Sequence, residues 1–186
     1  LWQETRLQKP FHLLGHSMGG LVAMAFALRY PQALQSLCVV DIAPRSYPFM
    51  HEKEFALLQS DFTNSNSRSR IDEEAAHIVG DPLVRNFLLT NLERTDSGYE
   101  WKINVPVLYK SRLTAAFPEE KAPWSGPTLF IHGSTSAYFQ PGDDDICLKH
   151  FPAAQFQCIT GGGHWLHVSH RDEFLNILKG WLKGFL

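Results

Sequence analysis

A serine with glycines on both sides lies near the start of the chain, in the string GHSMGG at residues 15–20. A short apolar run precedes the string and an amphipathic run follows it, so we predict a tight turn between a strand and a helix. Gly15 and Gly19 would leave room for the chain to reverse, and Gly20 would let the helix pack close to the strand. Such a turn lifts the hydroxyl of Ser17 clear of the sheet, where it can act as a nucleophile.

The backbone N–H of Met18 would lie in the first turn of the predicted helix, at the positive end of the helix dipole. We therefore predict Met18 as one donor to an oxyanion hole. The alternative is a glycine-rich turn that contains an incidental serine, because G-x-S-x-G by itself is a modest signal. The strand–turn–helix context is the one that the mechanism requires, and it favours catalysis at Ser17.

A serine hydroxyl needs a base to act as a nucleophile at neutral pH, and the chain offers nine histidines. His164 follows the glycines at 161–163, directly after the last predicted strand, so it would lie at the same sheet edge as Ser17. We predict His164 as the base, with a solvent-exposed loop histidine as the alternative. The spacing of His164, His167 and His170 does not put them on one helix face, so we expect no metal site.

Four short apolar runs predict the strands that would position these residues. The runs are Pro10–Leu14, Leu37–Ile42, Thr128–His132 and Gln155–Thr160. Apolar residues at helical spacing follow the first run, from Leu21 to Leu28, and recur near the end, from Phe174 to Leu182. Strands that alternate with helices predict an α/β fold with a parallel sheet.

The middle of the chain departs from this pattern, because residues 44–123 show helical patterns and no clear buried strand. We expect a core of residues 1–43 and 124–186, interrupted by a helical insertion over 44–123. Within the insertion, Asp81-Pro82 predicts a helix start with the aspartate as its N-cap.

The composition argues against several classes of partner. Lys and Arg number 17 and Asp and Glu 19, a net charge of -2, so no broad positive field is available to hold nucleic acid. No apolar run approaches the roughly 20 residues of a membrane span. The three cysteines, Cys38, Cys147 and Cys158, are scattered and odd in number, which favours a reducing compartment, and we expect the cytoplasm.

Three segments together resemble the α/β-hydrolase superfamily, and most closely its small carboxylesterases. They are GHSMGG at 15–20, VVDIAP at 39–44 and GHW at 163–165. The resemblance implies the C-terminal part of an α/β-hydrolase fold, with the insertion as a helical cap. It also implies a serine esterase that forms an acyl-enzyme, needs no cofactor and acts on a small acyl ester, with thioesters as a close variant.

The resemblance also guides the choice of the acid that would orient His164. Most α/β hydrolases carry this acid shortly after the glycine that ends the penultimate strand, and here Ser136 stands at that position. The superfamily's alternative is an acid after the preceding strand, where VVDIAP places Asp41, and we predict Ser17, His164 and Asp41 as the triad. For Asp41 the alternative is a structural carboxylate. The second choice of acid, Asp143–Asp145, suits a helix N-terminus better.

Aromatic side chains indicate where the apolar part of a substrate would bind. We predict His16, Tyr47 and Trp165 as pocket residues. His16 adjoins the predicted nucleophile, Trp165 adjoins the predicted base, and Tyr47 is one of several aromatic residues of the insertion. For the aromatic residues of the insertion, the alternative is that they form its own small core.

The sequence is also compatible with other functions. C–C bond hydrolysis and cofactor-free peroxidation occur on the same fold, whereas epoxide hydrolases and haloalkane dehalogenases attack with aspartate where this chain has Ser17. A non-catalytic hydrolase-like binding protein and an inactive fragment are further alternatives.

The chain begins at Leu1, and its first methionine is Met18, so we expect a piece of a longer protein. The upstream part would supply the second N–H of the oxyanion hole. We therefore expect this stretch alone to be poorly soluble or weakly active, because one donor and the neighbour of its first strand would be missing.

Overall fold

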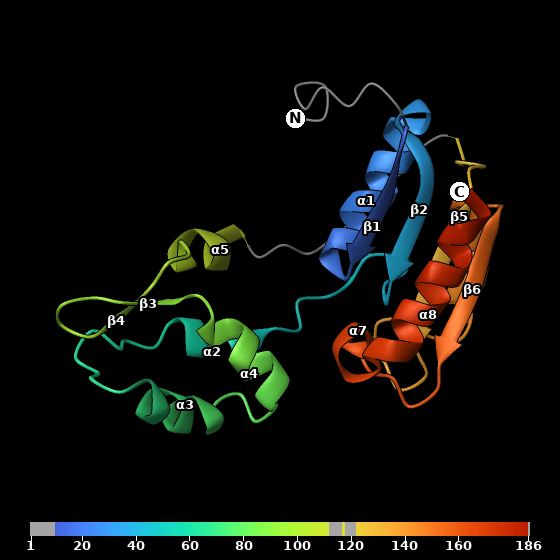
Figure 1. Cartoon of the computed structure of the whole chain (residues 1–186). Helices are drawn as coiled ribbons and strands as arrows, with labels where there is room; N and C mark the ends of the chain where they lie inside the picture. The colour runs from blue at the N-terminus through green and yellow to red at the C-terminus, as the bar shows by residue number, and fades with distance from the viewer. Residues whose placement is uncertain (1–9, 112–116, 118–121, 186) are drawn as a thin grey trace. The chain divides into compact units, whose positions relative to one another are not determined.

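The computed structural model describes residues 10–111, 117 and 122–185 (Figure 1). The chain divides into two compact units, one formed by Leu1–Ser46 with Ala115–Leu186 and the other by Tyr47–Thr114. All candidate site residues except Tyr47 belong to the first unit. The second unit lies within the insertion expected over residues 44–123, and a role for it as a cap stays a prediction.

A four-stranded parallel sheet is the centre of the first unit (Figure 1). The strands lie in the order β1-β2-β5-β6 and are β1 (Phe11–His16), β2 (Leu34–Val40), β5 (Thr128–Gly133) and β6 (Ala154–Ile159). These are the four strands that the apolar runs predict, with ends that differ by a few residues, so the predicted α/β fold is confirmed. Because every pair is parallel, the carboxyl ends of all four strands lie at one edge of the sheet.

Helices connect and cover these strands. They are α1 (Met18–Arg29), α6 (Asp143–His150), α7 (Leu166–Ser169) and α8 (Arg171–Leu182), with the 3-10 turns η1 (Pro31–Ala33) and η2 (Lys183–Phe185). Helix α1 ends just before Pro31, as its sequence predicts, because proline cannot continue the helical hydrogen-bond pattern.

Side chains of β2 show that α1 and α8 cover opposite faces of the sheet. A methyl group added at Gly20 of α1 would lie 3.2 Å from Val39, so α1 packs on the face that carries Val39. Cys38 and Val40 point to the other face, where they form a buried cluster with Phe174 of α8. With helices on both faces, β2 is buried along most of its length, which explains its continuous apolar sequence.

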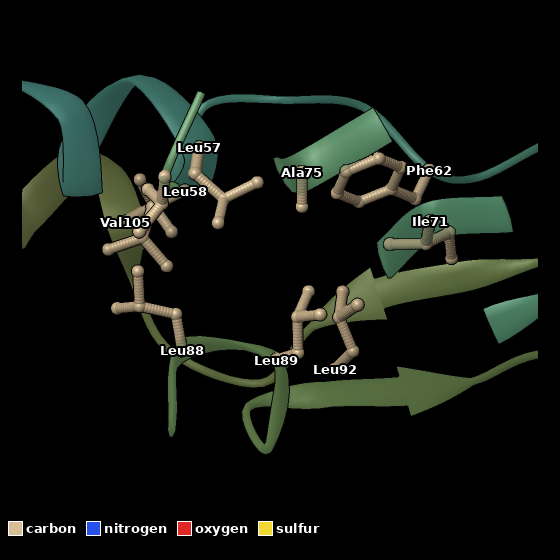
Figure 2. Close-up of a cluster of buried hydrophobic side chains, with 10 residues drawn as sticks. Leu57, Leu58, Phe62, Ile71, Ala75, Leu88, Leu89, Leu92 and Val105 are labelled. Atoms are coloured by element: carbon tan, nitrogen blue, oxygen red, sulfur yellow. The ribbon is translucent and has the colours of Figure 1, made fainter. Parts of the chain in front are cut away.

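The second unit has its own hydrophobic core (Figure 2). Its helices are α2 (Glu52–Leu58), α3 (Arg68–Ala76), α4 (Pro82–Leu89) and α5 (Val105–Ser111). Leu57, Ile71 and Leu89 from three of these helices point into one cluster and are almost fully buried (Figure 2). The N-cap predicted at Asp81 is confirmed, because its carboxylate accepts hydrogen bonds from the backbone N–H groups of Leu83 and Val84 at 2.8 and 3.3 Å.

This unit also contains a short antiparallel ribbon that the sequence analysis did not predict. Strands β3 (Leu92–Arg94) and β4 (Tyr99–Trp101) pair with Leu92 opposite Trp101. Each strand has only three residues, which is too short for an alternating apolar pattern to be distinguished from a turn.

Close packing requires the glycines at Gly15 in β1 and Gly20 in α1. A methyl group added at Gly15 would lie 2.2 Å from the carbonyl oxygen of Gly19, and one at Gly20 would lie 2.5 Å from the Ile42 side chain. Among the residues that the structure describes, a methyl group at Gly19 would meet nothing within 4 Å. The expected roles of Gly15 and Gly20 therefore agree with the packing, whereas no contact among the described residues requires a glycine at position 19.

This contrast predicts opposite effects of the same substitution at two positions of one turn. Gly15→Ala should lower the free energy of unfolding by about 1–3 kcal/mol, because strand and helix must separate to admit the methyl group. Gly19→Ala should leave it unchanged or raise it by up to about 1 kcal/mol, since alanine favours the helix. Urea unfolding of both variants of the full-length protein measures the difference, and equal stabilities would contradict the prediction.

Candidate active site

Ser17 occupies the sharp turn between the end of β1 at His16 and the start of α1 at Met18. Its backbone angles, φ 55° and ψ -127°, are unfavourable for a residue with a side chain. Hydrogen bonds from both sides hold this conformation. The Ser17 N–H donates to the carbonyl of Val40 on β2 at 3.0 Å, and the Ser17 carbonyl accepts from the N–H of Gly20 at 2.8 Å.

The start of α1 directly after Ser17 places the Met18 N–H in the first helical turn. The N–H groups of a first turn have no partner within the helix and carry the positive end of its dipole. An anion that forms on the Ser17 side of the turn would meet such donors. The assignment of Met18 to an oxyanion hole stays a prediction.

The structure brings the side chains of Ser17, His164 and Asp41 into one line of contacts. His164 Nε2 lies 2.9 Å from Ser17 Oγ, and His164 Nδ1 lies 2.7 Å from Asp41 Oδ2. The three residues follow β1, β6 and β2, so the parallel sheet brings together groups that are far apart in the sequence. Their catalytic roles are proposed below.

Asp41 is the buried member of this line, with 1% of its surface exposed. Its backbone adopts a positive φ of 53° directly after β2, and its N–H donates to the Ile131 carbonyl at 2.9 Å. Oδ1 accepts a hydrogen bond from the Gly133 N–H at 3.0 Å, and Oδ2 faces His164. A buried carboxylate requires such donors, because transfer from water without them costs several kcal/mol.

Ser136 is a site residue that sequence reasoning missed as a functional group. Its hydroxyl donates a hydrogen bond to Asp41 Oδ2, and its own oxygen accepts from the N–H of Tyr138 at 3.1 Å. The Tyr138 ring also stacks on the imidazole of His164, with ring centres 3.8 Å apart and an interplanar angle of 23°. The position of Ser136 in the sequence could have indicated this contact. Most α/β hydrolases carry the acid at this position, so a side chain there lies near His164.

The second choice of acid has a different partner. Asp143 Oδ1 and Oδ2 accept hydrogen bonds from Arg45 Nε at 3.0 and 3.2 Å, and Oδ2 also accepts from the Gln140 N–H at 2.8 Å. Asp144 and Asp145 are exposed in the first turn of α6, as the sequence predicts for a helix N-terminus. The carboxylate that contacts His164 is therefore that of Asp41.

The predicted pocket residues fall in different places. His16 and Trp165 lie beside His164, with their ring centres 5.6 Å apart, and the Trp165 ring centre is 6.3 Å from that of His164. Tyr47 is the first residue of the second unit. A substrate-binding role for His16, Trp165 and Tyr47 stays a prediction.

Burial changes the acid–base properties of the histidines around the base. The pKa of His16 is lowered to about 4, mainly by burial, although its hydrogen bond to the His164 carbonyl acts in the opposite direction. Burial also lowers the pKa of His167, and the nearby His164 adds to this effect. Both shifts favour the neutral form of these two imidazoles.

Two further features concern the described part of the chain as a whole. No group of three or more His, Cys, Asp or Glu side chains in it has a geometry that could hold a metal ion. Each helix in the same residues is too short or too polar to serve as a transmembrane segment.

The line from Asp41 through His164 to Ser17 can support acyl transfer. An imidazole between a serine hydroxyl and a buried carboxylate can take the proton of the serine and carry the resulting positive charge next to the carboxylate. The same arrangement of side chains is found on several unrelated folds, so it does not by itself identify a family.

Known proteins are similar to this chain over nearly its whole length. It is 34% identical to "sn-1-specific diacylglycerol lipase ABHD11" of Mus musculus over 93% of the chain and 59% of that protein. It is 32% identical to "Esterase YbfF" of Escherichia coli (strain K12) over 91% of the chain and 66% of that protein. The chain thus spans less than two thirds of the length of these relatives.

Structural comparison agrees with the sequence relatives. The solved structure of a marine microorganism esterase superposes with a TM-score of 0.89 at 30% sequence identity, over 96% of this chain and 72% of that one. A family model described as the alpha/beta hydrolase fold matches residues 3–171. This chain therefore belongs to the α/β-hydrolase family.

Proposed function

We propose that this chain carries the catalytic centre of a serine hydrolase that cleaves carboxylic esters through an acyl-enzyme. Ser17 is the nucleophile, His164 the general base and acid, and Asp41 the carboxylate that orients His164. The Met18 N–H is one donor to the oxyanion. The observation that carries the proposal is the line of contacts at 2.9 and 2.7 Å that joins the three side chains behind a strained turn.

The proposed reaction begins when Ser17 Oγ attacks the ester carbonyl and transfers its proton to His164 Nε2. The carbonyl oxygen becomes negatively charged and accepts a hydrogen bond from the Met18 N–H. Collapse of this intermediate breaks the ester bond, and His164 Nε2 returns its proton to the leaving alcohol. Water then attacks the acyl group by the same steps in reverse, releasing the acid and free Ser17.

Asp41 would act on His164 rather than on the substrate. Its carboxylate keeps the Nδ1 proton of the imidazole in place, which leaves Nε2 free to accept the proton of Ser17. When His164 becomes positively charged, the adjacent negative charge stabilises it, and the Gly133 N–H and the Ser136 hydroxyl stabilise the carboxylate in turn.

The names of the relatives support a carboxylic ester as substrate. The mouse protein is named a diacylglycerol lipase, and the bacterial protein and the solved marine structure are named esterases. We propose a small acyl ester, with thioesters cleaved by the same chemistry. His16 and Trp165 are the pocket residues proposed in the first unit, and a cap role for the second unit with a substrate-binding role for Tyr47 stays a prediction.

We also propose the cellular compartment in which the protein acts. The unpaired thiols of Cys38, Cys147 and Cys158 favour a reducing environment such as the cytoplasm.

Removal of the nucleophile tests the proposed function. In the full-length protein, Ser17→Ala should abolish covalent labelling by a fluorophosphonate and lower kcat/KM for p-nitrophenyl butyrate by about 10³-fold or more. Ser97→Ala is the matched control, because it removes an exposed hydroxyl between β3 and β4. Labelling that survives in Ser17→Ala would show that another residue is the nucleophile.

Ser136→Ala tests whether the hydroxyl beside Asp41 contributes to turnover. Loss of a hydrogen bond to a charged group should lower kcat about tenfold with little change in KM, because the acid then holds His164 less firmly. Ser136→Thr keeps the hydroxyl and should recover most of the activity. The prediction fails if Ser136→Ala and the natural protein have the same kcat.

A further inference from the structure

His16 contacts the loop between β6 and α7, residues 160–165, which carries His164 and is called the base loop below. The reaction as described does not use this contact. His16 is the last residue of β1 and directly precedes Ser17. Its Nε2 lies 2.8 Å from the backbone carbonyl oxygen of His164. A carbonyl oxygen only accepts hydrogen bonds, so Nε2 of His16 must carry the proton. A neutral ring with the proton on Nε2 and a charged ring both meet this condition, and the lowered pKa of His16 favours the neutral ring.

Two consecutive side chains thus contact the same residue of the base loop. His16 binds the backbone carbonyl of His164, and Ser17 contacts its ring nitrogen Nε2 at 2.9 Å. Asp41 holds the other ring nitrogen at 2.7 Å. The backbone and the ring of His164 are each held, and the backbone contact comes from the strand that also carries the nucleophile.

Other hydrogen bonds to this loop act on the glycines before His164. The N–H and hydroxyl of Thr135 donate to the Gly162 carbonyl at 3.0 and 2.8 Å. Ser134 Oγ accepts from the Gly161 N–H at 2.8 Å. These bonds fix the loop to the end of β5, whereas the bond from His16 acts at the base residue itself.

We propose that His16 is a positioning residue that keeps the base in register with the nucleophile by donating its Nε2 proton to the His164 carbonyl. The inference rests on the proposed function of Ser17 and His164. It gives a role to the residue directly before the nucleophile that is separate from binding substrate.

The charges around His16 explain why a histidine suits this role. The ring centre of His16 lies 4.7 Å from that of His164, which becomes positively charged during acyl transfer. A lysine or arginine at this position could donate the same hydrogen bond, but it would oppose the charging of His164. Burial and the neighbouring imidazoles of His164 and His167 lower the pKa of His16 to about 4, so it donates without carrying a charge.

Aromatic packing restricts the ring of His16. The ring centre of His167 is 4.4 Å away and that of Trp165 is 5.6 Å away. The His167 ring therefore packs against the ring of His16. Because packing restricts the ring of His16 on these sides, its Nε2 stays directed at the His164 carbonyl. Little further conformational entropy of this side chain is then lost when substrate binds.

A pair of variants separates hydrogen bonding from ring size. Glutamine reaches about as far as Nε2 and keeps an N–H donor, whereas methionine has a similar length and no donor. In the full-length protein, His16→Met should lower kcat for p-nitrophenyl butyrate about three- to tenfold, with KM within about twofold. His16→Gln should stay within about twofold of the natural protein. His12→Met, on the same strand and exposed, is the control and should leave kcat unchanged.

Active sites should be counted by fluorophosphonate titration, so that a loss of folded protein does not lower the measured kcat. An unchanged kcat in His16→Met overturns the inference while the assignment of Ser17 stands. Equal losses in His16→Gln and His16→Met also overturn it, because the donor would then not matter.

If the natural protein neither labels nor turns over, the proposed function fails, and the contact of His16 is tested without activity. The ¹⁵N spectrum of its imidazole at pH 7 should show a neutral ring with the proton on Nε2. A proton on Nδ1, or a charged ring, would overturn the inference.

Discussion

The buried carboxylate of Asp41 is the constraint on which the rest of the site depends. With 1% of its surface exposed, it needs hydrogen-bond donors from the protein, because water cannot supply them. The donors are the Gly133 N–H, the Ser136 hydroxyl and Nδ1 of His164. They come from the last residue of β5 and from the segments that follow β5 and β6. One charge directly after β2 is therefore satisfied by groups from two other strand ends at the same edge of the sheet.

The surrounding packing explains how two unfavourable backbone conformations persist. Ser17 and Asp41 both have positive φ values, 55° and 53°, although neither is glycine. Each is held by hydrogen bonds to a neighbouring strand, Ser17 to Val40 and Asp41 to Ile131. Gly133 completes the arrangement, because a methyl group there would lie 2.2 Å from the Gly162 carbonyl and would separate β5 from the base loop. Strain at the functional groups is thus maintained by regular structure around them.

In the proposed function, the acid that orients His164 follows β2 instead of β5. Asp41 follows β2, and the position after β5 where most family members carry the acid holds Ser136, whose hydroxyl binds the same carboxylate. Both positions lie at one sheet edge and reach the same side of His164. His164 needs a negatively charged oxygen at Nδ1, and the ends of neighbouring parallel strands can each supply a carboxylate there.

The amino-acid sequence by itself determined the features that depend on local pattern. Continuous apolar runs predicted all four strands of the sheet, and the strand–GHSMGG–helix pattern predicted the turn at Ser17. The order of strands and the glycines before His164 indicated that His164 and Ser17 share an edge of the sheet. Features that depend on contacts between distant residues were decided by the tertiary structure alone: the hydroxyl of Ser136 on Asp41, the His16 contact with the His164 carbonyl, the ion pair of Arg45 with Asp143, and the open space beside Gly19. Sequence patterns report burial and backbone preference, whereas hydrogen-bond direction and close approach depend on where a residue's distant neighbours lie.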